Sequence, residues 1–279
     1  MVHFHLPPDA PVALAAALSA LGAVISGLWR EGRRAYLRAD SERGPLFSRY
    51  STDTADVPVL EHEADVRRII GDDGVLRTPP VIDTGRGWLI EPQKHAEPLA
   101  GDEAIDSILA ALADLPQRDL PTFEHDRSRR AAMMAAAHRR TRIALSSLPL
   151  RDVARARAIV AESPLPQVTS HGDLHAGNVL VSNGDTWLVD WELSGNRSAG
   201  YDLMQLWPTI ADEADRERLW EGAVEIVGRK HRTALARLRY ALAVRTIANK
   251  LCSPARFQRD FEGGRRVLAL LPELRAEAD

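Results

Sequence analysis

The residues best suited to chemistry lie in one stretch of the sequence, residues 170–192. Within it, Asp173, Asn178 and Asp190 provide two carboxylates and one amide. Carboxylate and amide oxygens are the ligands that Mg2+ prefers, and a separate carboxylate can accept the proton of an attacking hydroxyl group. Metal-assisted phosphoryl transfer requires this combination. The spacing therefore indicates phosphoryl-transfer chemistry.

A predicted hairpin brings the second carboxylate near the amide. The Asn-Gly pair at 183–184 lies between two apolar runs, which is a strong hairpin signal. Pairing the residues on either side of this turn places Asn178 and Asp190 within one register step at the open end of the hairpin. In a regular ladder their side chains would point to opposite faces, so one of them must leave strand geometry to share an ion. Asn178, which borders the loop, is the residue expected to do so.

The loop before the hairpin also matches a known catalytic pattern, H-R-D-L-x-x-x-N. The matching residues are His171, Asp173, Leu174 and Asn178. Gly172 replaces the arginine of that pattern. Together with the Asp-Trp-Glu sequence that starts at Asp190, the segment resembles the signature of the aminoglycoside phosphotransferase and choline kinase family. These are small-molecule kinases with a protein-kinase-like fold.

The resemblance assigns a role to each matching residue. It implies Asp173 as the catalytic base, Asn178 and Asp190 as magnesium ligands, and His171 as an orienting residue. It also implies that Asp202, in the Gly-Tyr-Asp-Leu sequence at 200–203, braces the catalytic loop. The implied cofactors are ATP and Mg2+, and the sequence does not exclude GTP. The implied enzyme is a kinase with an alcohol group as acceptor.

The family pattern also implies a lysine on the third strand that binds the ATP phosphates and pairs with a helix glutamate. This chain departs from it, because only three of its 36 basic residues are lysines and the first of them is Lys94. Arg49, in the predicted strand at 46–50, is the natural substitute, with Glu63 as its partner. The swap is not conservative, since the guanidinium fork is larger than an ammonium group.

Two further features concern the nucleotide. The resemblance implies that the hinge from Glu91 to Gln93 binds adenine through its backbone. The loop that covers the nucleotide is poorly marked, because Gly27 and Gly32 do not form G-x-G-x-x-G.

Elements that position these residues can be predicted from periodicity and turn residues. Strands are expected at 23–29, 34–39, 46–50, 80–83 and 87–91, and a first helix is expected to begin with Asp9 as its cap and to end at Gly22. A second helix is expected from Val57 to Ile70, where Glu63 falls on the apolar stripe and so requires a cation. The pattern is mainly helical from residue 101 onward.

The predicted fold class is therefore α+β, a bilobal protein-kinase-like fold. Residues 1–93 form a nucleotide-binding lobe with a small antiparallel sheet and one helix, and residues 94–279 form a larger, mainly helical lobe that holds the catalytic residues and the acceptor.

Composition excludes several other classes. The net charge of −3 and the pI near 6.3 give no reason to expect a nucleic-acid partner. The uncharged stretch at 10–29 is rich in Ala, Gly and Ser and has no preceding Lys or Arg, which disfavours a signal peptide or a membrane helix. The single cysteine, Cys252, favours a reducing compartment, so a cytoplasmic location is expected. The sequence does not determine the oligomeric state.

The expected acceptor is a hydroxyl group of a small molecule such as an antibiotic, a sugar or another natural product. Residues 117–160 carry ten basic and four acidic side chains, which counts against a polycationic aminoglycoside. Three alternatives stay open: a nucleotide-binding pseudokinase, a kinase-like enzyme that modifies a peptide Ser or Thr, and a hydrolase with a transition metal bound by His171, Asp173 and His175.

Overall fold

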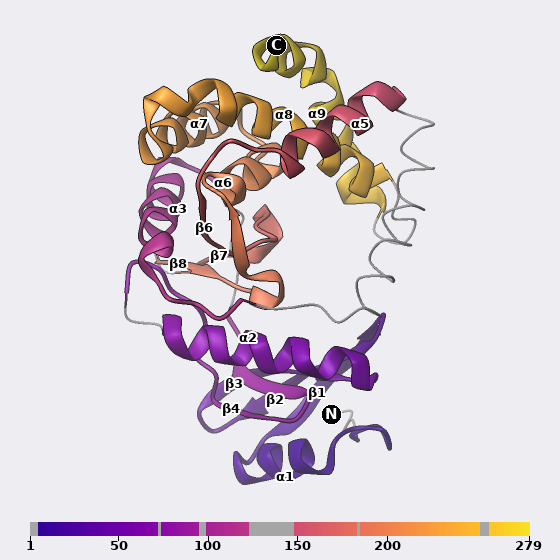
Figure 1. Cartoon of the computed structure of the whole chain (residues 1–279). Helices are drawn as coiled ribbons and strands as arrows, with labels where there is room; N and C mark the ends of the chain where they lie inside the picture. The colour runs from indigo at the N-terminus through magenta and orange to yellow at the C-terminus, as the bar shows by residue number, and fades with distance from the viewer. Residues whose placement is uncertain (1–4, 72–73, 95–98, 123–147, 183–184, 252–256) are drawn as a thin grey trace.

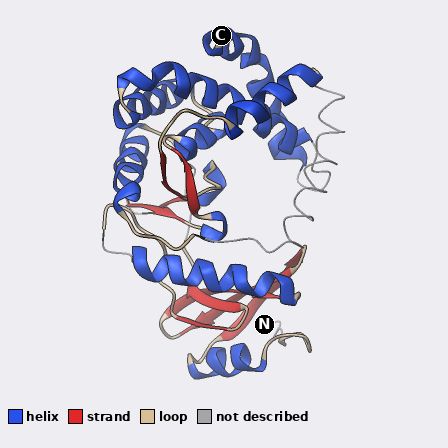
Figure 2. Cartoon of the chain, viewed as in Figure 1, coloured by secondary structure: helices blue, strands red, loops and turns tan. Residues whose placement is uncertain are grey.

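The computed structural model describes residues 5–71, 74–94, 99–122, 148–182, 185–251 and 257–279. Figure 1 shows a sheet-containing N-terminal part and a larger helical C-terminal part. Coloured by secondary structure, the strands gather mainly in the first part and the helices in the second (Figure 2). This is the predicted α+β, protein-kinase-like architecture.

The N-terminal sheet has five antiparallel strands in the order β1-β2-β3-β5-β4. Their bounds are β1 Val24–Glu31, β2 Arg34–Ser41, β3 Gly44–Ser51, β4 Asp83–Gly85 and β5 Trp88–Pro92. The strand predicted at 80–83 is wrong except for Asp83, where β4 begins. A proline cannot donate a ladder hydrogen bond, and the segment before β4 starts with Pro79 and Pro80.

One face of the sheet is covered by helix α1, Val12–Ala20 (Figure 1). Leu14 and Leu18 are buried there, in one cluster with apolar side chains of β2, β3 and β5. The prediction that Asp9 caps this helix is wrong: the helix begins after Pro11, and no side chain caps it. Asp9 instead pairs with Arg30 of β1 at 2.6 Å, which takes its carboxylate away from the helix end.

Helix α2, Val57–Ile70, lies between the sheet and the helical part (Figure 1). Its bounds are those predicted, with Pro58 in the first turn and Gly71 directly after the last residue. Glu63 is fully buried, as the apolar stripe predicts. The helix therefore presents a carboxylate to the junction between the two parts.

The C-terminal part is built from six α-helices among the described residues. They are α3 Asp102–Asp114, α5 Leu150–Ala161, α6 Tyr201–Leu206, α7 Glu213–Val227, α8 Arg232–Leu251 and α9 Phe257–Ala278. Their apolar side chains form one core, in which Trp207, Trp220 and Tyr240 are buried. None of the helices in the described part of the chain is both long and apolar enough to cross a membrane.

Two small antiparallel sheets in the C-terminal part frame the predicted catalytic segment. The strands β6 Gln167–Ser170 and β9 Gly195–Ser198 form one sheet, and β7 Val179–Ser182 and β8 Asp185–Leu188 form the other. The β7–β8 register pairs Ser182 with Asp185, as predicted from the turn sequence. The segment from 171 to 178 thus runs from the end of β6 to the start of β7.

Several predicted features lie outside the described residues. Most of the basic stretch at 117–160 falls in 123–147, and Cys252 falls in 252–256.

Candidate active site

The loop after β6 is held by the side chain of Asp202, in the first turn of α6. Its two carboxylate oxygens accept hydrogen bonds from the backbone N–H groups of His171 and Gly172, at 2.7 and 2.9 Å. Burial raises the pKa of Asp202, and the nearby His171 and these N–H groups oppose the rise. One side chain thus fixes the start of the loop through backbone contacts.

Gly172 adopts a conformation that favours glycine. Its φ is +84°, and a Cβ atom there would lie 2.1 Å from the backbone oxygen of Leu193. The arginine of the general pattern therefore has no space at this position.

The His171 ring supports the hairpin from the same loop. Its Nε2 lies 2.9 Å from the backbone oxygen of Val189, and the ring packs against Trp191 with centroids 4.4 Å apart. A carbonyl oxygen can only accept, so Nε2 carries the proton in this contact. His171 is thereby placed as an orienting residue would be, between the loop and the end of the hairpin.

Asp173, two residues after His171, is partly buried. Its Oδ1 accepts a hydrogen bond of 2.7 Å from Nε2 of Gln205 in α6, and its backbone oxygen accepts one of 2.9 Å from Nδ2 of Asn178. Gln205 was missed by sequence reasoning, because a contact across 32 residues has no local signal. Among the described residues, no side chain or backbone group is recorded as a hydrogen-bond partner of the second carboxylate oxygen of Asp173.

Asn178 lies at the open end of the hairpin beside the residue that precedes Asp190, since the backbone N–H of Val189 donates to the backbone oxygen of Asn178 at 3.0 Å. Both residues leave strand geometry, although only one was expected to do so. Asn178 lies in a 3-10 turn, and Asp190 has a φ of +69°, in the left-handed region. Left-handed backbone at a non-glycine residue is uncommon and often marks a functional site.

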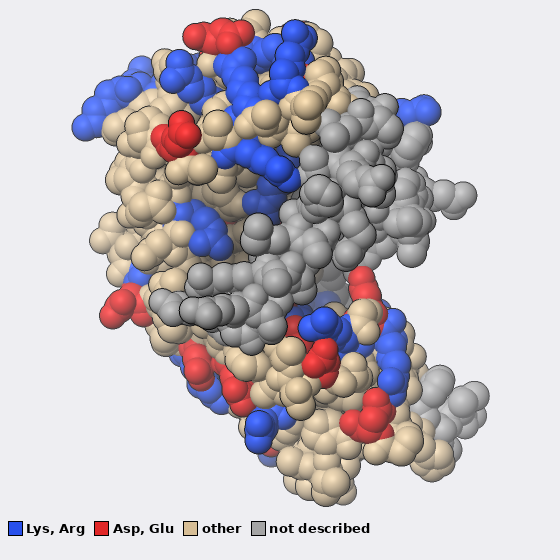
Figure 3. Space-filling view, turned by 45° about the vertical axis from the view of Figure 1, so that its right-hand side comes forward, with Lys and Arg blue, Asp and Glu red and all other residues tan. Residues whose placement is uncertain are grey.

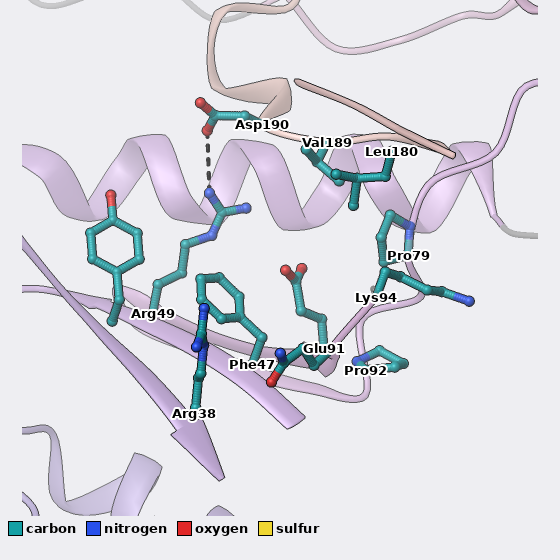
Figure 4. Close-up of a pocket in the computed structure, with 12 residues that line it drawn as sticks. Arg38, Phe47, Arg49, Pro79, Glu91, Pro92, Lys94, Leu180, Val189 and Asp190 are labelled. Carbon is teal, nitrogen blue, oxygen red and sulfur yellow. Dashed lines mark hydrogen bonds and ion pairs between the residues drawn. The ribbon is translucent and has the colours of Figure 1, made fainter. Parts of the chain in front are cut away.

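A chain of buried charges links Asp190 to the N-terminal sheet. Arg49 of β3 forms an ion pair with Glu63 of α2 and lies 3.2 Å from Oδ1 of Asp190 (Figure 4). Burial raises the pKa of Glu63 to about 7, and the positive charges of Arg49 and Arg67 oppose that rise. The sequence prediction that Arg49 and Glu63 meet therefore agrees with the geometry.

The chain of charges extends further than the sequence indicated. Arg67, one turn after Glu63 in α2, lies 3.7 Å from Glu63 and forms an ion pair with Glu91 of β5. The four-residue spacing of Glu63 and Arg67 was a signal that could have been used. The pairing with Glu91 was not predictable, because it depends on how α2 packs on β5.

A second set of contacts joins the two parts beside this chain. Arg34 of β2 pairs with Asp56 at 2.6 Å and with Glu192, and His62 of α2 lies 2.8 Å from the hydroxyl of Ser194. Burial and the neighbouring Asp190 raise the pKa of Glu192, and Arg34 opposes the rise. Contacts from the sheet therefore hold both acidic residues of the Asp-Trp-Glu segment: Arg49 contacts Asp190, and Arg34 contacts Glu192.

A cavity of about 280 Å³ opens between the sheet and the hairpin (Figure 4). Its lining includes all three residues of the predicted hinge and both ends of the Arg49–Asp190 contact: Tyr36, Arg38, Phe47, Arg49, Pro79, Glu91, Pro92, Gln93, Lys94, Leu180, Val189 and Asp190. The backbone N–H of Gln93 donates to the oxygen of Pro45 at 2.9 Å, and Pro92 has no N–H. Hinge residues 92 and 93 therefore offer no free backbone donor to a ligand.

Surface charge is uneven on the face shown in Figure 3. Lysine and arginine side chains gather over the helical part, at the top of the view, whereas acidic and basic side chains are interspersed over the sheet-containing part.

Comparisons with known proteins identify the family of this chain. Residues 30–239 match the model of the phosphotransferase enzyme family, which is most of the chain. The chain therefore belongs to that family. It is a phosphotransferase that acts on a hydroxyl group.

Solved structures show the same fold at low identity. An ethanolamine kinase of Plasmodium vivax has a TM-score of 0.57 at 12% identity, with 90% of this chain and 83% of that chain covered. The macrolide 2'-phosphotransferase MphH of Brachybacterium faecium has a TM-score of 0.55 at 18% identity, with 87% of this chain and 98% of that chain covered. A thermostable mutant of the aminoglycoside phosphotransferase APH(4)-Ia, in complex with ADP and hygromycin B, has a TM-score of 0.58 at 14% identity, with 94% of this chain and 97% of that chain covered. The search of curated protein sequences found no match.

The close approach at Gly172 generates a prediction about stability. Gly172→Ala should lower the free energy of unfolding by about 2 kcal/mol or more, because the new Cβ meets a backbone oxygen in addition to the strained φ. Gly22→Ala is the matched control, since Gly22 has a φ of +62° with nothing within 4 Å of a Cβ. It should cost only about 1 kcal/mol. Equal losses in urea unfolding of the two variants would contradict the steric account.

Proposed function

We propose that this protein is an ATP- and Mg2+-dependent kinase that phosphorylates a hydroxyl group of a small molecule. The observation that carries the proposal is a set of four residues joined by direct contacts beside the cavity: Asn178 donates to the backbone oxygen of Asp173, Arg49 pairs with Asp190, and Val189, the residue before Asp190, donates to the backbone oxygen of Asn178. They come from the loop, the hairpin and the sheet, and phosphoryl transfer needs each of their chemistries.

In this proposal Asp173 is the catalytic base. The Oδ1 contact with Gln205 orients the carboxylate, so that the other oxygen can accept the proton of the acceptor hydroxyl as the new O–P bond forms, the bond from the γ-phosphorus to the bridging oxygen breaks and ADP leaves. His171 and Asp202 keep the loop in place through contacts with Val189 and with the loop backbone.

The donor set fits a magnesium ion. The Nδ2 atom of Asn178 donates to the backbone oxygen of Asp173, which leaves its Oδ1 for a metal, and within the described part of the chain Arg49 contacts only Oδ1 of Asp190, which leaves Oδ2 for the ion. Few protein ligands of hard oxygen type suit Mg2+, which keeps waters and phosphate oxygens. When bound, the ion neutralises phosphate charge. In the described residues no group of three His, Cys, Asp or Glu side chains is placed to hold a metal, so the hydrolase alternative has no geometric support.

Arg49 takes the position of the phosphate-binding lysine in this proposal. Its guanidinium group lines the cavity and lies between Glu63 and Asp190, where an ATP phosphate would meet a fixed positive charge. The acceptor is proposed to be a neutral or anionic hydroxyl compound, because the basic stretch at 117–160 disfavours an aminoglycoside. A cytoplasmic location is proposed with it.

The base assignment can be tested with Asp173→Asn. Phosphoryl transfer should fall by about 1000-fold because the amide cannot accept the proton, while the dissociation constant for ATP should change less than threefold because Asp173 does not line the cavity. Transfer is measured with radiolabelled ATP and binding by calorimetry. Asp106→Asn, at an exposed pair with Arg218, is the control. Full transfer by the Asp173 variant would refute the assignment.

Substituting Arg49 tests the phosphate contact. Arg49→Met should lower kcat/KM for ATP by about 100-fold, whereas Arg49→Lys, which keeps the charge, should lose less than about tenfold. Steady-state kinetics at saturating acceptor measures both. If the wild-type protein were a pseudokinase, it would bind ATP but transfer phosphate to no acceptor. Equal activity of the Met and Lys variants would exclude Arg49 from the phosphate site.

Gln205 is proposed as a positioning residue for Asp173. Gln205→Leu removes the N–H donor, so kcat should fall about 10- to 100-fold as the carboxylate loses its orientation. KM for ATP should stay within threefold of the wild-type value, since Gln205 does not line the cavity. Gln205→Glu, of the same shape without the donor, should lose at least as much. A parallel rise of KM, or unchanged kcat, would refute this role.

A further inference from the structure

Glu91 places a carboxylate inside the cavity. It lies opposite Phe47 in the β3–β5 register, so the two side chains share one face of the sheet with Arg49. Figure 4 shows the Glu91 carboxylate pointing from β5 into the cavity, between Arg49 and Pro79. Only 7% of the residue is exposed. A buried carboxylate at this position is expensive unless it has a structural or a binding role.

Arg67 holds this carboxylate from behind. The guanidinium of Arg67 is fully buried in α2, pairs with Oε2 of Glu91 and donates from Nε to the oxygen of Pro79 at 3.1 Å. These contacts fix the direction of the Glu91 side chain. The ion pair occupies one side of the carboxylate and leaves the side that lines the cavity for a ligand.

The cavity around Glu91 has the form of a slot. Phe47 lies on the sheet side, and Leu180 and Val189 lie on the hairpin side (Figure 4). Apolar groups on two opposite sides suit a flat aromatic ring.

The polar edge of the slot offers acceptors where Glu91 lies. The carboxylate of Glu91 and residues 92 and 93, which have no free backbone N–H, form this part of the edge, while the side chains of Gln93 and Lys94 also line the cavity. A carboxylate accepts hydrogen bonds and donates none when ionised. The edge is therefore complementary to an amino group on the ring and unfavourable to a carbonyl oxygen.

We propose that the Glu91 side chain, oriented by Arg67, is a specificity-determining group for the nucleobase: it accepts a hydrogen bond from the 6-amino group of adenine and rejects purines with a 6-oxo group. This inference rests on the proposed nucleotide-dependent function. It differs from the expectation for the hinge, which assigned base recognition to the backbone alone. It also gives a physical reason for a glutamate facing the cavity.

The test compares ATP with inosine triphosphate, which carries a 6-oxo group in place of the 6-amino group. Dissociation constants of both are measured by calorimetry with excess Mg2+, on the wild-type protein and on Glu91→Gln. The wild-type protein should bind ATP at least about tenfold more tightly. Glu91→Gln has an amide that donates as well as accepts, so the ratio should fall to between one and three. Glu61→Gln, the same substitution at an exposed position of α2, should keep the wild-type ratio.

The possible results separate the role of Glu91 from the proposed function. Equal binding of the two nucleotides by the wild-type protein, or an unchanged ratio in Glu91→Gln, would overturn the role of Glu91 and leave the proposed function intact. Binding of neither nucleotide by the wild-type protein would overturn both. The wild-type comparison needs no variant, so the inference stays testable even if Glu91→Gln fails to fold.

Discussion

The contact on which the rest of this structure depends is the one made by Arg49. A single buried cation meets Glu63 from α2 and Asp190 from the hairpin, and so fixes a strand, a helix and a loop relative to one another. Removing any partner of such a buried set leaves an uncompensated charge, which is strongly destabilising. The cation at this position is a guanidinium, which can contact two carboxylates at once. Asp190 is both a partner of Arg49 and a proposed metal ligand. Its position is therefore coupled to the sheet that forms one side of the cavity.

The other side of the site is positioned by backbone contacts. Asp202 binds two consecutive N–H groups, Gly172 allows the chain to pass next to Leu193, and His171 bonds to the carbonyl just before Asp190. These contacts need no ligand, so Asp173 and Asp190 are pre-organised by the fold. Pre-organised polar groups are a general source of rate enhancement in enzymes, because little reorganisation is needed during the reaction.

The sequence predicted the elements whose signals are local. The hairpin register followed from an Asn-Gly turn, and the bounds of α2 followed from Pro58 and Gly71. The glutamate on the apolar stripe of α2 required a cation, and Arg49 supplies it. Features that depend on tertiary packing were not predictable. Gln205 reaches Asp173 from another helix, Arg67 reaches Glu91 only because α2 packs on β5, and Asp9 pairs with Arg30 in preference to capping α1.

The central claim is that this arrangement transfers phosphate to a hydroxyl group of a small molecule. The most direct measurement is a screen of hydroxylated compounds incubated with protein, ATP and Mg2+, in which mass spectrometry detects the gain of one phosphate. The panel should include neutral and anionic sugars, nucleoside-type natural products, Ser- and Thr-containing peptides, and aminoglycosides. We expect a phosphorylated product from a neutral or anionic small molecule, which disappears when Mg2+ is chelated. Tight ATP binding without any phosphorylated product across the panel would contradict the account and support a pseudokinase.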